Sequence, residues 1–246
     1  MLTIDPKDIA TQKLYGLMVS TVGPRPIAFA STMNAEGKPN LAPFSFFNMM
    51  SANPPILVFS PVLKISDKSS KHTLQNVEQN KEVVINVVNY DIVQQMSLAS
   101  TAYAEGVNEF EKAGLTMQDA EMVKPFRVKE SPVQFECKVT QIVTLGEEGG
   151  AGHLVCCEVL KMHIADEVLD ENNKIDQFKL DQVSRMGGNL YSRANKGIFE
   201  IPKPISSMGM GVDALPESIR KSTILTGNDI GKLGTLEAAP EEKEVE

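Results

Sequence analysis

The chain has 246 residues, of which 42% are hydrophobic and 23% charged, a composition that suits a globular protein with a sizeable core. Its formal net charge of −8 argues against the basic surface that binds nucleic acid. Three cysteines, two of them adjacent at Cys156 and Cys157, give no paired disulfide framework and favour a reducing, cytoplasmic setting. Neither a signal peptide nor the roughly 18 apolar residues of a membrane span is evident, so we expect a soluble protein that is not membrane-bound.

Most of the predicted elements are strands rich in β-branched or aromatic residues. In the run VQFECKVTQIVTL, apolar Val133, Phe135 and Cys137 alternate with polar neighbours, which is typical of a strand with one buried face. The segment GEEGGAG then predicts a hairpin loop, and HLVCCEVLKMHI predicts the returning strand. The predicted strands are residues 26–33, 40–49, 56–62, 82–89, 132–145 and 153–164.

Helices are predicted to be few and short, at residues 70–80 and 90–101. Long strands joined by hairpins favour a mainly β fold, an antiparallel barrel, over a doubly wound sheet.

The chain is expected to form one main domain over residues 1–205. Residues 206–236 are rich in glycine and polar residues, with one short helix predicted at 216–221, and we expect an arm that packs on the body or on a partner. The last ten residues, 237–246, hold five glutamates and one lysine and therefore half of the net charge. Such a segment has too few apolar residues to offset the entropy of ordering and is predicted to be disordered.

The stretch GPRPIAFASTMNAEGKPNLAPFSFFNMM, residues 23–50, predicts a polar hairpin. NAEG at residues 34–37 is a turn with asparagine first and glycine last, so the flanking strands should run antiparallel. Ser31, Thr32 and Ser45 could then gather on neighbouring strands beside aromatic rings. That mixture suits a flat ligand with polar edges, although the same hydroxyls could be ordinary strand residues.

Further along, SPVLKISDKSSKHT brings serines, lysines and a threonine to the start of the helix predicted at 70–80. Free amides at a helix start, together with hydroxyls and Lys71, predict an anion site that suits a phosphate. Without other support, Lys71 and Thr73 could equally be a solvated lysine and a helix-start residue. A phosphate site near the polar hairpin suggests a nucleotide-like cofactor.

From about residue 15 to about residue 200 the chain resembles the flavin reductase-like family of FMN-binding split barrels, which includes the flavoredoxins. The resemblance rests on the ordered succession RPIAFAST, NAEGKPNLAPFSFFN, NPPILVFSP, KHT, VVINVVN, NEF, AGL and ESPVQFEC. It implies a split antiparallel β-barrel that binds FMN at the interface of a homodimer. In place of the Lys-Asp-Thr often found in the family, this chain has His72 between the lysine and the threonine. The flavin contacts that the resemblance implies are Arg25, Thr32, Ser45, Phe46, Phe47, Asn48, Lys71 and Thr73.

Neither a catalytic side chain nor a metal site is predicted. The chain has no HExxH, no GxSxG and no GxGxxG after a strand, so no hydrolase or Rossmann nicotinamide site is indicated. His153, Cys156, Cys157 and His163 share one predicted strand, where successive side chains point to opposite faces and cannot converge on a metal.

Three functions fit the expected FMN site. The first is an NAD(P)H-dependent flavin reductase or a related oxidoreductase, in which the flavin carries the chemistry. The second is a flavoredoxin-like electron carrier that is reduced by a redox protein, and the third is a flavin-binding module for storage or regulation. The sequence does not separate the first two functions, because both need the same pocket. We expect the oxidoreductase, with the electron carrier as the alternative.

Overall fold

The structure is a computed structural model that describes residues 1–104, 106–201 and 209–237. The chain divides into two compact units, residues 1–198 and residues 199–246. The boundary predicted between residues 205 and 206 falls outside the described residues.

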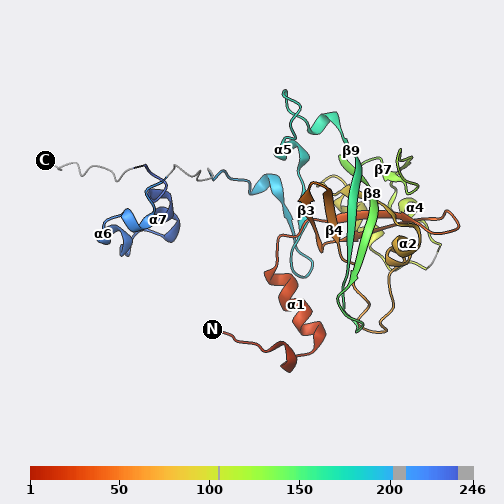
Figure 1. The fold of residues 1–246 in the computed structure, drawn as a ribbon, viewed down its shortest axis with the longest axis horizontal. Coiled ribbons are helices and arrows are strands. Elements are labelled where there is room, and N and C mark those ends of the chain that lie inside the picture. The colour runs from red at the N-terminus through yellow and green to blue at the C-terminus, as the bar shows by residue number, and fades with distance from the viewer. Residues whose placement is uncertain (105, 202–208, 238–246) are drawn as a thin grey trace. The chain divides into compact units, whose positions relative to one another are not determined.

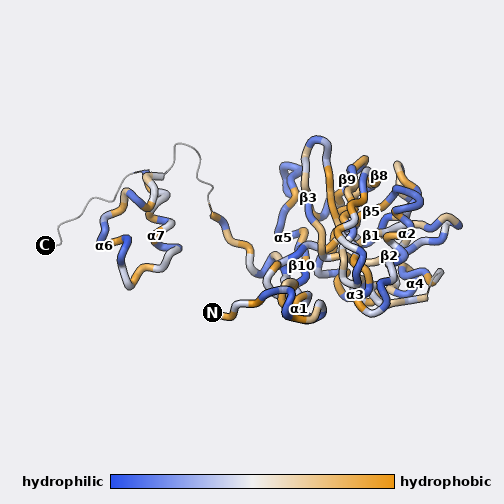
Figure 2. Tube along the Cα trace, turned by 60° about the horizontal axis from the view of Figure 1, so that its bottom comes forward, coloured by the Kyte–Doolittle hydropathy of each residue, from blue (hydrophilic) through white to orange (hydrophobic). Residues whose placement is uncertain are grey.

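A seven-stranded antiparallel sheet forms the body of the first unit (Figure 1). Hydrophobic residues run through its central strands (Figure 2). The prediction of a mainly β, antiparallel fold with few short helices is confirmed. In spatial order, the strands are β2 (Pro39–Phe44), β1 (Ala28–Met33), β5 (Glu82–Val87), β8 (Val133–Thr144), β9 (His153–Ile164), β4 (Pro55–Phe59) and β3 (Phe47–Ala52).

The sheet is rolled but not closed. Its two edge strands, β2 and β3, are consecutive in the chain and are separated only by Ser45 and Phe46. In a flat sheet the two edges would lie six strand spacings apart, about 29 Å, whereas a step from residue 44 to residue 47 spans at most about 11 Å. The sheet must therefore curve until its edges approach, although no pairing between β2 and β3 occurs among the described residues.

The hairpin around residues 34–37 forms as predicted. The Gly37 amide donates to the Asn34 carbonyl at 3.0 Å, and the Asn34 side chain accepts from the amides of Glu36 and Lys38. Gly37 has φ +81°, which is the left-handed conformation that glycine adopts without strain. Strands β1 and β2 pair antiparallel across this turn. The strand predicted over residues 40–49 is wrong as a single element, because it breaks at Ser45 and Phe46 into β2 and β3.

Helices pack against both faces of the sheet. Helix α2 (His72–Asn80) buries Leu74 and Val77 in the larger core, which the inward side chains of the sheet also form. Helices α3 (Val93–Ala99) and α4 (Glu109–Ala113) cover β1 and β2 from the other side, where a second core contains Phe29, Met96 and Phe110. The helices predicted at 70–80 and 90–101 are confirmed as α2 and α3, with later starts.

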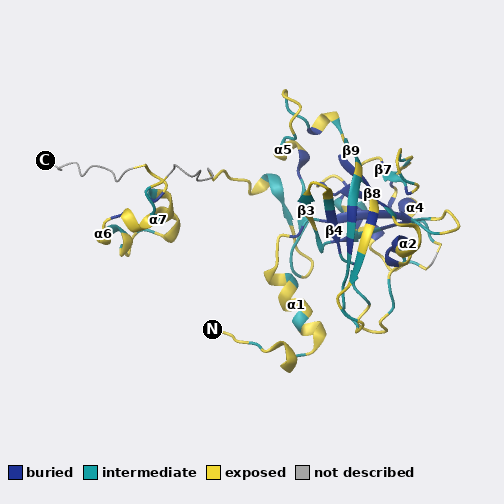
Figure 3. Ribbon diagram, in the orientation of Figure 1, coloured by how far each residue is buried: buried dark blue, intermediate teal, exposed yellow. Residues whose placement is uncertain are grey.

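The other elements of the first unit are short, except for α1 (Thr11–Thr21), which has no buried residue and projects from the body (Figures 1 and 3). A small hairpin of β10 (Val183–Arg185) and β11 (Tyr191–Arg193) is joined to the body through an antiparallel bridge between Arg25 and Arg185. The remaining elements are η1 (Pro6–Asp8), β6 (Met117–Gln118), β7 (Arg127–Val128), η2 (Asp166–Val168), α5 (Gln177–Leu180) and η3 (Ala194–Lys196).

The second unit contains η4 (Val212–Ala214), α6 (Glu217–Arg220) and α7 (Gly227–Leu233). Helix α6 matches the helix predicted at 216–221. Thr226 caps α7, since its hydroxyl accepts from the Asp229 amide while the Asp229 carboxylate accepts from the Thr226 amide. The predicted tail, apart from Glu237, lies outside the described residues. None of the helices in the described parts of the chain is long and apolar enough to cross a membrane.

Candidate functional site

Three adjoining pockets form a trough where β2 ends and the sheet is split. Pro43 lines all three pockets, Lys71 and Ser45 each line two, and the cavity volumes are about 170, 180 and 120 Å³. Because the pockets share these residues, we treat them as one continuous site, called the trough below. It lies along the end of β2, beside the start of α2 and the link between β2 and β3.

The start of α2 forms one end of the trough, where Ser70, Lys71 and Thr73 line the pocket. Lys71 is the N-cap residue, so the first amides of the helix point outward without intrahelical acceptors. The Lys71 ammonium lies 5.1 Å from the centroid of the Phe44 ring. Desolvation of the ammonium group, together with repulsion from Lys64, lowers the pKa of Lys71. This end of the trough therefore offers amides, hydroxyls and positive charge to an anion.

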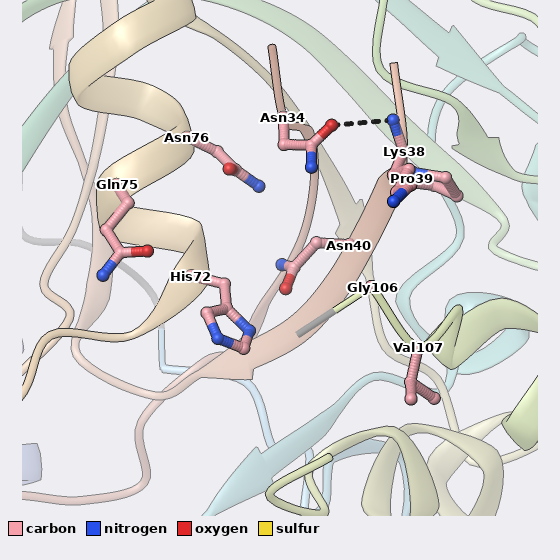
Figure 4. Close-up of a pocket in the computed structure, with 9 residues that line it drawn as sticks. All are labelled: Asn34, Lys38, Pro39, Asn40, His72, Gln75, Asn76, Gly106 and Val107. Carbon is pink, nitrogen blue, oxygen red and sulfur yellow. Dashed lines mark hydrogen bonds between the residues drawn. The ribbon is translucent and has the colours of Figure 1, made fainter. Parts of the chain in front are cut away.

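A buried chain of hydrogen bonds holds Thr73 from behind. The Asn40 side-chain amide donates to Thr73 Oγ1 at 2.9 Å and lies 3.4 Å from Thr32 Oγ1, which also accepts from Asn76 at 3.0 Å. Because the Thr73 hydroxyl accepts from Asn40, its own proton stays available for a ligand in the trough. Thr32 itself is fully buried beneath this network. Figure 4 shows Asn40 on β2 and Asn76 on α2 beside His72, in a smaller pocket that adjoins the trough.

Arg25 organises the other end of the trough. Its guanidinium donates to the carbonyls of Val19 and Val22, where α1 ends, and to the Met186 carbonyl in the β10–β11 turn at 2.9 Å. Its Nε lies 3.4 Å from Ser45 Oγ. Burial lowers the pKa of Arg25, although Tyr15 counteracts this shift. The side chain is only 8% exposed and holds three segments of the chain together rather than lining the trough.

The link between β2 and β3 contributes part of what the sequence predicts. Ser45 and Phe46 line the trough, and the Phe46 ring lies 6.3 Å from the Tyr15 ring, measured between centroids. Phe47 turns toward the larger core instead. Asn48 is exposed, and its side-chain oxygen accepts from the Met49 amide at 2.8 Å.

The eight predicted contacts thus fall into two groups of four. Ser45, Phe46, Lys71 and Thr73 line the trough, whereas Arg25, Thr32, Phe47 and Asn48 do not. The hydroxyls of Ser31 and Thr32 do not gather on one side, because successive residues of β1 face opposite sides of the sheet. The positions of Arg25 and Thr32 follow from contacts with distant segments of the chain.

Sequence reasoning missed several residues that line the trough. Ser100 and Tyr103 follow α3, and Glu109 begins α4. Burial raises the pKa of Glu109. The hydrogen bond that its carboxylate accepts from the Leu41 amide at 3.0 Å acts in the opposite direction but is the smaller effect. The segment NEF, which carries Glu109, was part of the resemblance, but the residues alone gave no sign that α4 reaches the trough.

The residues that the structure describes contain no cluster of three or more His, Cys, Asp or Glu side chains that could hold a metal ion. Glu136 and His163 do meet, with 2.6 Å between Oε1 and Nε2. Glu136 also accepts from the amides of Glu121 and Met122. Burial acts to raise the pKa of Glu136, but these hydrogen bonds outweigh it and the pKa is lowered. Glu136 therefore holds the loop that contains Glu121 and Met122 against the sheet.

Comparison with known proteins identifies the family. The sequence model of the flavin reductase like domain matches residues 21–179. The chain belongs to the flavin reductase-like family. An uncharacterized protein of Aquifex aeolicus is 38% identical over 188 residues, which cover 76% of this chain and 93% of that protein.

Solved structures share the fold. Nitrilotriacetate monooxygenase component B from Bacillus cereus superposes with a TM-score of 0.76 at 28% identity, over 82% of this chain and 98% of that one. A putative flavin reductase with a split barrel domain from Shewanella frigidimarina superposes with a TM-score of 0.68 at 23% identity, over 82% of this chain and all of that one. The second likeness is one of fold alone. The resemblance drawn from the sequence is thereby confirmed at the level of the family.

Proposed function

We propose that this family member is an FMN-binding oxidoreductase that takes electrons from NAD(P)H, and that its rolled, open sheet is an FMN-binding split barrel. The observation that carries the proposal is the trough itself. One end has the donors that a phosphate needs, and the rest has the aromatic and hydroxyl groups that suit a flat ring.

The residues present fit FMN. Ser70, Lys71 and Thr73, with the first amides of α2, would hold the phosphate, and the hydroxyl proton left available on Thr73 supports this assignment. Among the residues that line this end, Glu109 is the only carboxylate, and one of its oxygens is occupied by the Leu41 amide. Ser45 and Phe46 would lie toward the ring or the ribityl chain. Bound FMN would supply hydride or electron transfer, so that the protein contributes binding and orientation.

The four predicted contacts that do not line the trough are proposed to act indirectly. Thr32 would position Thr73 through Asn40, and Arg25 would position Ser45. Phe47 and Asn48 would fix the strand that carries the link.

We also propose that the protein is a homodimer. The edge strands β2 and β3 leave backbone groups unpaired, and an exposed edge invites pairing or covering by another chain. On β9, Leu160, Met162 and Ile164 alternate along one face and are all exposed. Such an apolar face on a sheet is a common subunit interface. A cytoplasmic setting is proposed because all three cysteines are free.

Substitutions at the phosphate end test the proposal. Thr73→Ala removes one hydrogen bond to a charged group, worth roughly 1.5 to 3 kcal/mol, and should lower FMN affinity about tenfold to hundredfold. Lys71→Ala should weaken FMN similarly and make the remaining binding less sensitive to salt. Thr73→Ser keeps the hydroxyl and is the matched control, which should bind FMN nearly as well as the unsubstituted protein.

Riboflavin, which lacks the phosphate, separates a ligand role from a folding role. Both alanine substitutions should barely change its weaker binding, whereas Ser45→Ala should weaken both flavins. Equal losses of FMN and riboflavin in Thr73→Ala and Lys71→Ala would contradict the assignment. Anaerobic titration of the FMN-loaded protein with NADH and NADPH then distinguishes the enzyme, whose yellow colour bleaches within seconds, from a carrier that reacts slowly.

A further inference from the structure

The β10–β11 hairpin gives the trough a second end with a different chemistry. Arg185 and Tyr191 line the pocket of about 180 Å³ that also contains Pro43, Ser45 and Ser100. Tyr191 lines another pocket on its far side, of about 190 Å³, together with Tyr90 and Arg193. The hairpin therefore forms a wall of the trough away from the start of α2.

The two arginines of this hairpin differ in how their charge is used. The Arg193 guanidinium donates to both carboxylate oxygens of Asp181, one of them at 2.9 Å, and lies 3.7 Å from the centroid of the Tyr90 ring. Its charge is thus neutralised within the fold. Arg185 lies 4.5 Å from the Tyr191 ring centroid and donates to the carbonyl of Gly188. No carboxylate pairs with it among the residues that the structure describes.

The surroundings of Arg185 strengthen the preference for an anion. Arg25 lies close enough for the two like charges to repel, and it is bound to backbone carbonyls and a hydroxyl rather than to an acid. No carboxylate lines the pocket that Arg185 and Tyr191 share with the trough. In a chain with net charge −8, this is a local region of positive potential.

The hairpin is held rigidly enough to present these groups. Arg25 and Arg185 exchange backbone hydrogen bonds of 3.0 and 2.8 Å, and the Arg25 side chain holds the Met186 carbonyl. In the turn, Gly187 approaches Ser20 of α1 so closely that a Cβ there would lie 2.5 Å from the Ser20 hydroxyl oxygen. A site that is ordered before binding loses less entropy when its ligand arrives.

We propose that Arg185 and Tyr191 bind a small aromatic carboxylate at this end of the trough. This inference rests on the proposed function. The guanidinium fork matches a carboxylate through two parallel hydrogen bonds, which a point charge cannot provide. Tyr191 offers an aromatic surface to a ring. The part of the trough that these two residues line has a cavity volume of about 180 Å³, which leaves room for a single ring.

Benzoate is the probe that tests this proposal, with benzamide as the neutral ligand of the same shape and acetate as the anion without a ring. Binding is measured by ligand-observed NMR on the FMN-loaded protein, which does not depend on turnover. We expect benzoate to bind more tightly than either comparison ligand. Arg185→Gln should weaken benzoate about tenfold to hundredfold and leave benzamide unchanged. Arg185→Lys should fall between the two, because it keeps the charge and loses the fork.

Controls separate this site from the flavin site and from general charge effects. Lys138→Gln removes a positive charge from an exposed position on β8 that lines none of the three pockets of the trough, and it should not change benzoate affinity. A failure of the FMN proposal appears separately, in Thr73→Ala and Lys71→Ala. FMN affinity is also measured in Arg185→Gln, and a loss for FMN as large as that for benzoate would assign Arg185 to the flavin instead. Thermal unfolding of each variant checks that it is folded.

Three further results would overturn the inference. The first is equal benzoate affinity in Arg185→Gln and the unsubstituted protein, and the second is equal binding of benzoate and benzamide. The third is a loss of NADH or NADPH affinity in Arg185→Gln without a loss for benzoate, which would assign Arg185 to a nucleotide phosphate.

Discussion

Replacing Arg25 by alanine tests the claim that this side chain organises the trough rather than binding a ligand. The substitution leaves the carbonyls of Val19, Val22 and Met186 without their donor. A hydrogen bond to a charged group contributes about 1.5–3 kcal/mol. Water can reach part of the space that the side chain leaves, so we expect a loss of about 3 kcal/mol in the free energy of unfolding rather than the sum of three bonds. For a unit of this size, that corresponds to a fall of roughly 6–12 °C in Tm.

Two measurements check the expected result. Urea denaturation gives the loss of stability, and hydrogen exchange of peptides from residues 183–193 should show faster opening of the β10–β11 hairpin. Arg185→Ala is the matched control, because it removes an arginine from the same hairpin but only one described side-chain hydrogen bond, to Gly188, and a contact with the Tyr191 ring. Its cost should be about 1.5 kcal/mol, half of that expected for Arg25→Ala, because one bond is lost instead of three. Equal losses in the two variants, or unchanged exchange of the hairpin in Arg25→Ala, would refute this role for Arg25.

The remaining predictions concern assembly, acid stability and the tail. Light scattering at micromolar concentration should report twice the chain mass of 26.9 kDa, and a value near the monomer would contradict the proposed dimer. The pKa of Glu136 is lower in the folded state than its ordinary value of 4.5, so its contribution to stability is present above that pH and is lost as the pH falls through the folded pKa. Glu136→Gln should therefore be less stable at pH 7 and lose less stability on acidification, whereas parallel curves of urea midpoint against pH would rule this out. Removal of residues 237–246 should leave the ratio of flavin to protein unchanged, because dense glutamates near a phosphate would repel it; a large drop would place the tail at the site.

Local sequence patterns predict the strands because their determinants are local. The strand around Val133 and the turn at residues 34–37 depend on neighbours within a few positions, and both elements appear in the structure. The predicted single buried face is wrong in the first half of β8, because Gln134 and Glu136 are buried as well. The break at Ser45 and Phe46 is different. No glycine interrupts the run there, and the link is held by the Ser60 amide, which donates to the Phe46 carbonyl, and by Arg25. Contacts with distant segments set this break, so periodicity could not reveal it.

The same distinction separates the two halves of the predicted site. Lys71 and Thr73 are adjacent to a helix start, so their shared location follows from the sequence once the helix is recognised. Whether Arg25 faces a ligand or the carbonyls of the chain depends on Met186, which lies 161 positions away. Thr32 likewise is buried because Asn76 on α2 covers it. A polar residue in a hairpin therefore indicates where a site lies. It does not indicate whether its own side chain contacts the ligand.

Under the proposed function, the split in the sheet would connect cofactor binding to assembly. Because the edge strands β2 and β3 are joined by two residues, the split, the unpaired strand edges and the trough all lie in the same part of the body. A partner subunit that covers an edge there would also restrict the link at Ser45 and Phe46. Under the proposed function, a ligand that orders this link favours the dimer, and by linkage the dimer favours the ligand by the same factor. FMN affinity should therefore fall when the protein is diluted below its dimer dissociation constant. An FMN affinity that is independent of protein concentration across that range would show that FMN binding and dimer formation are not coupled.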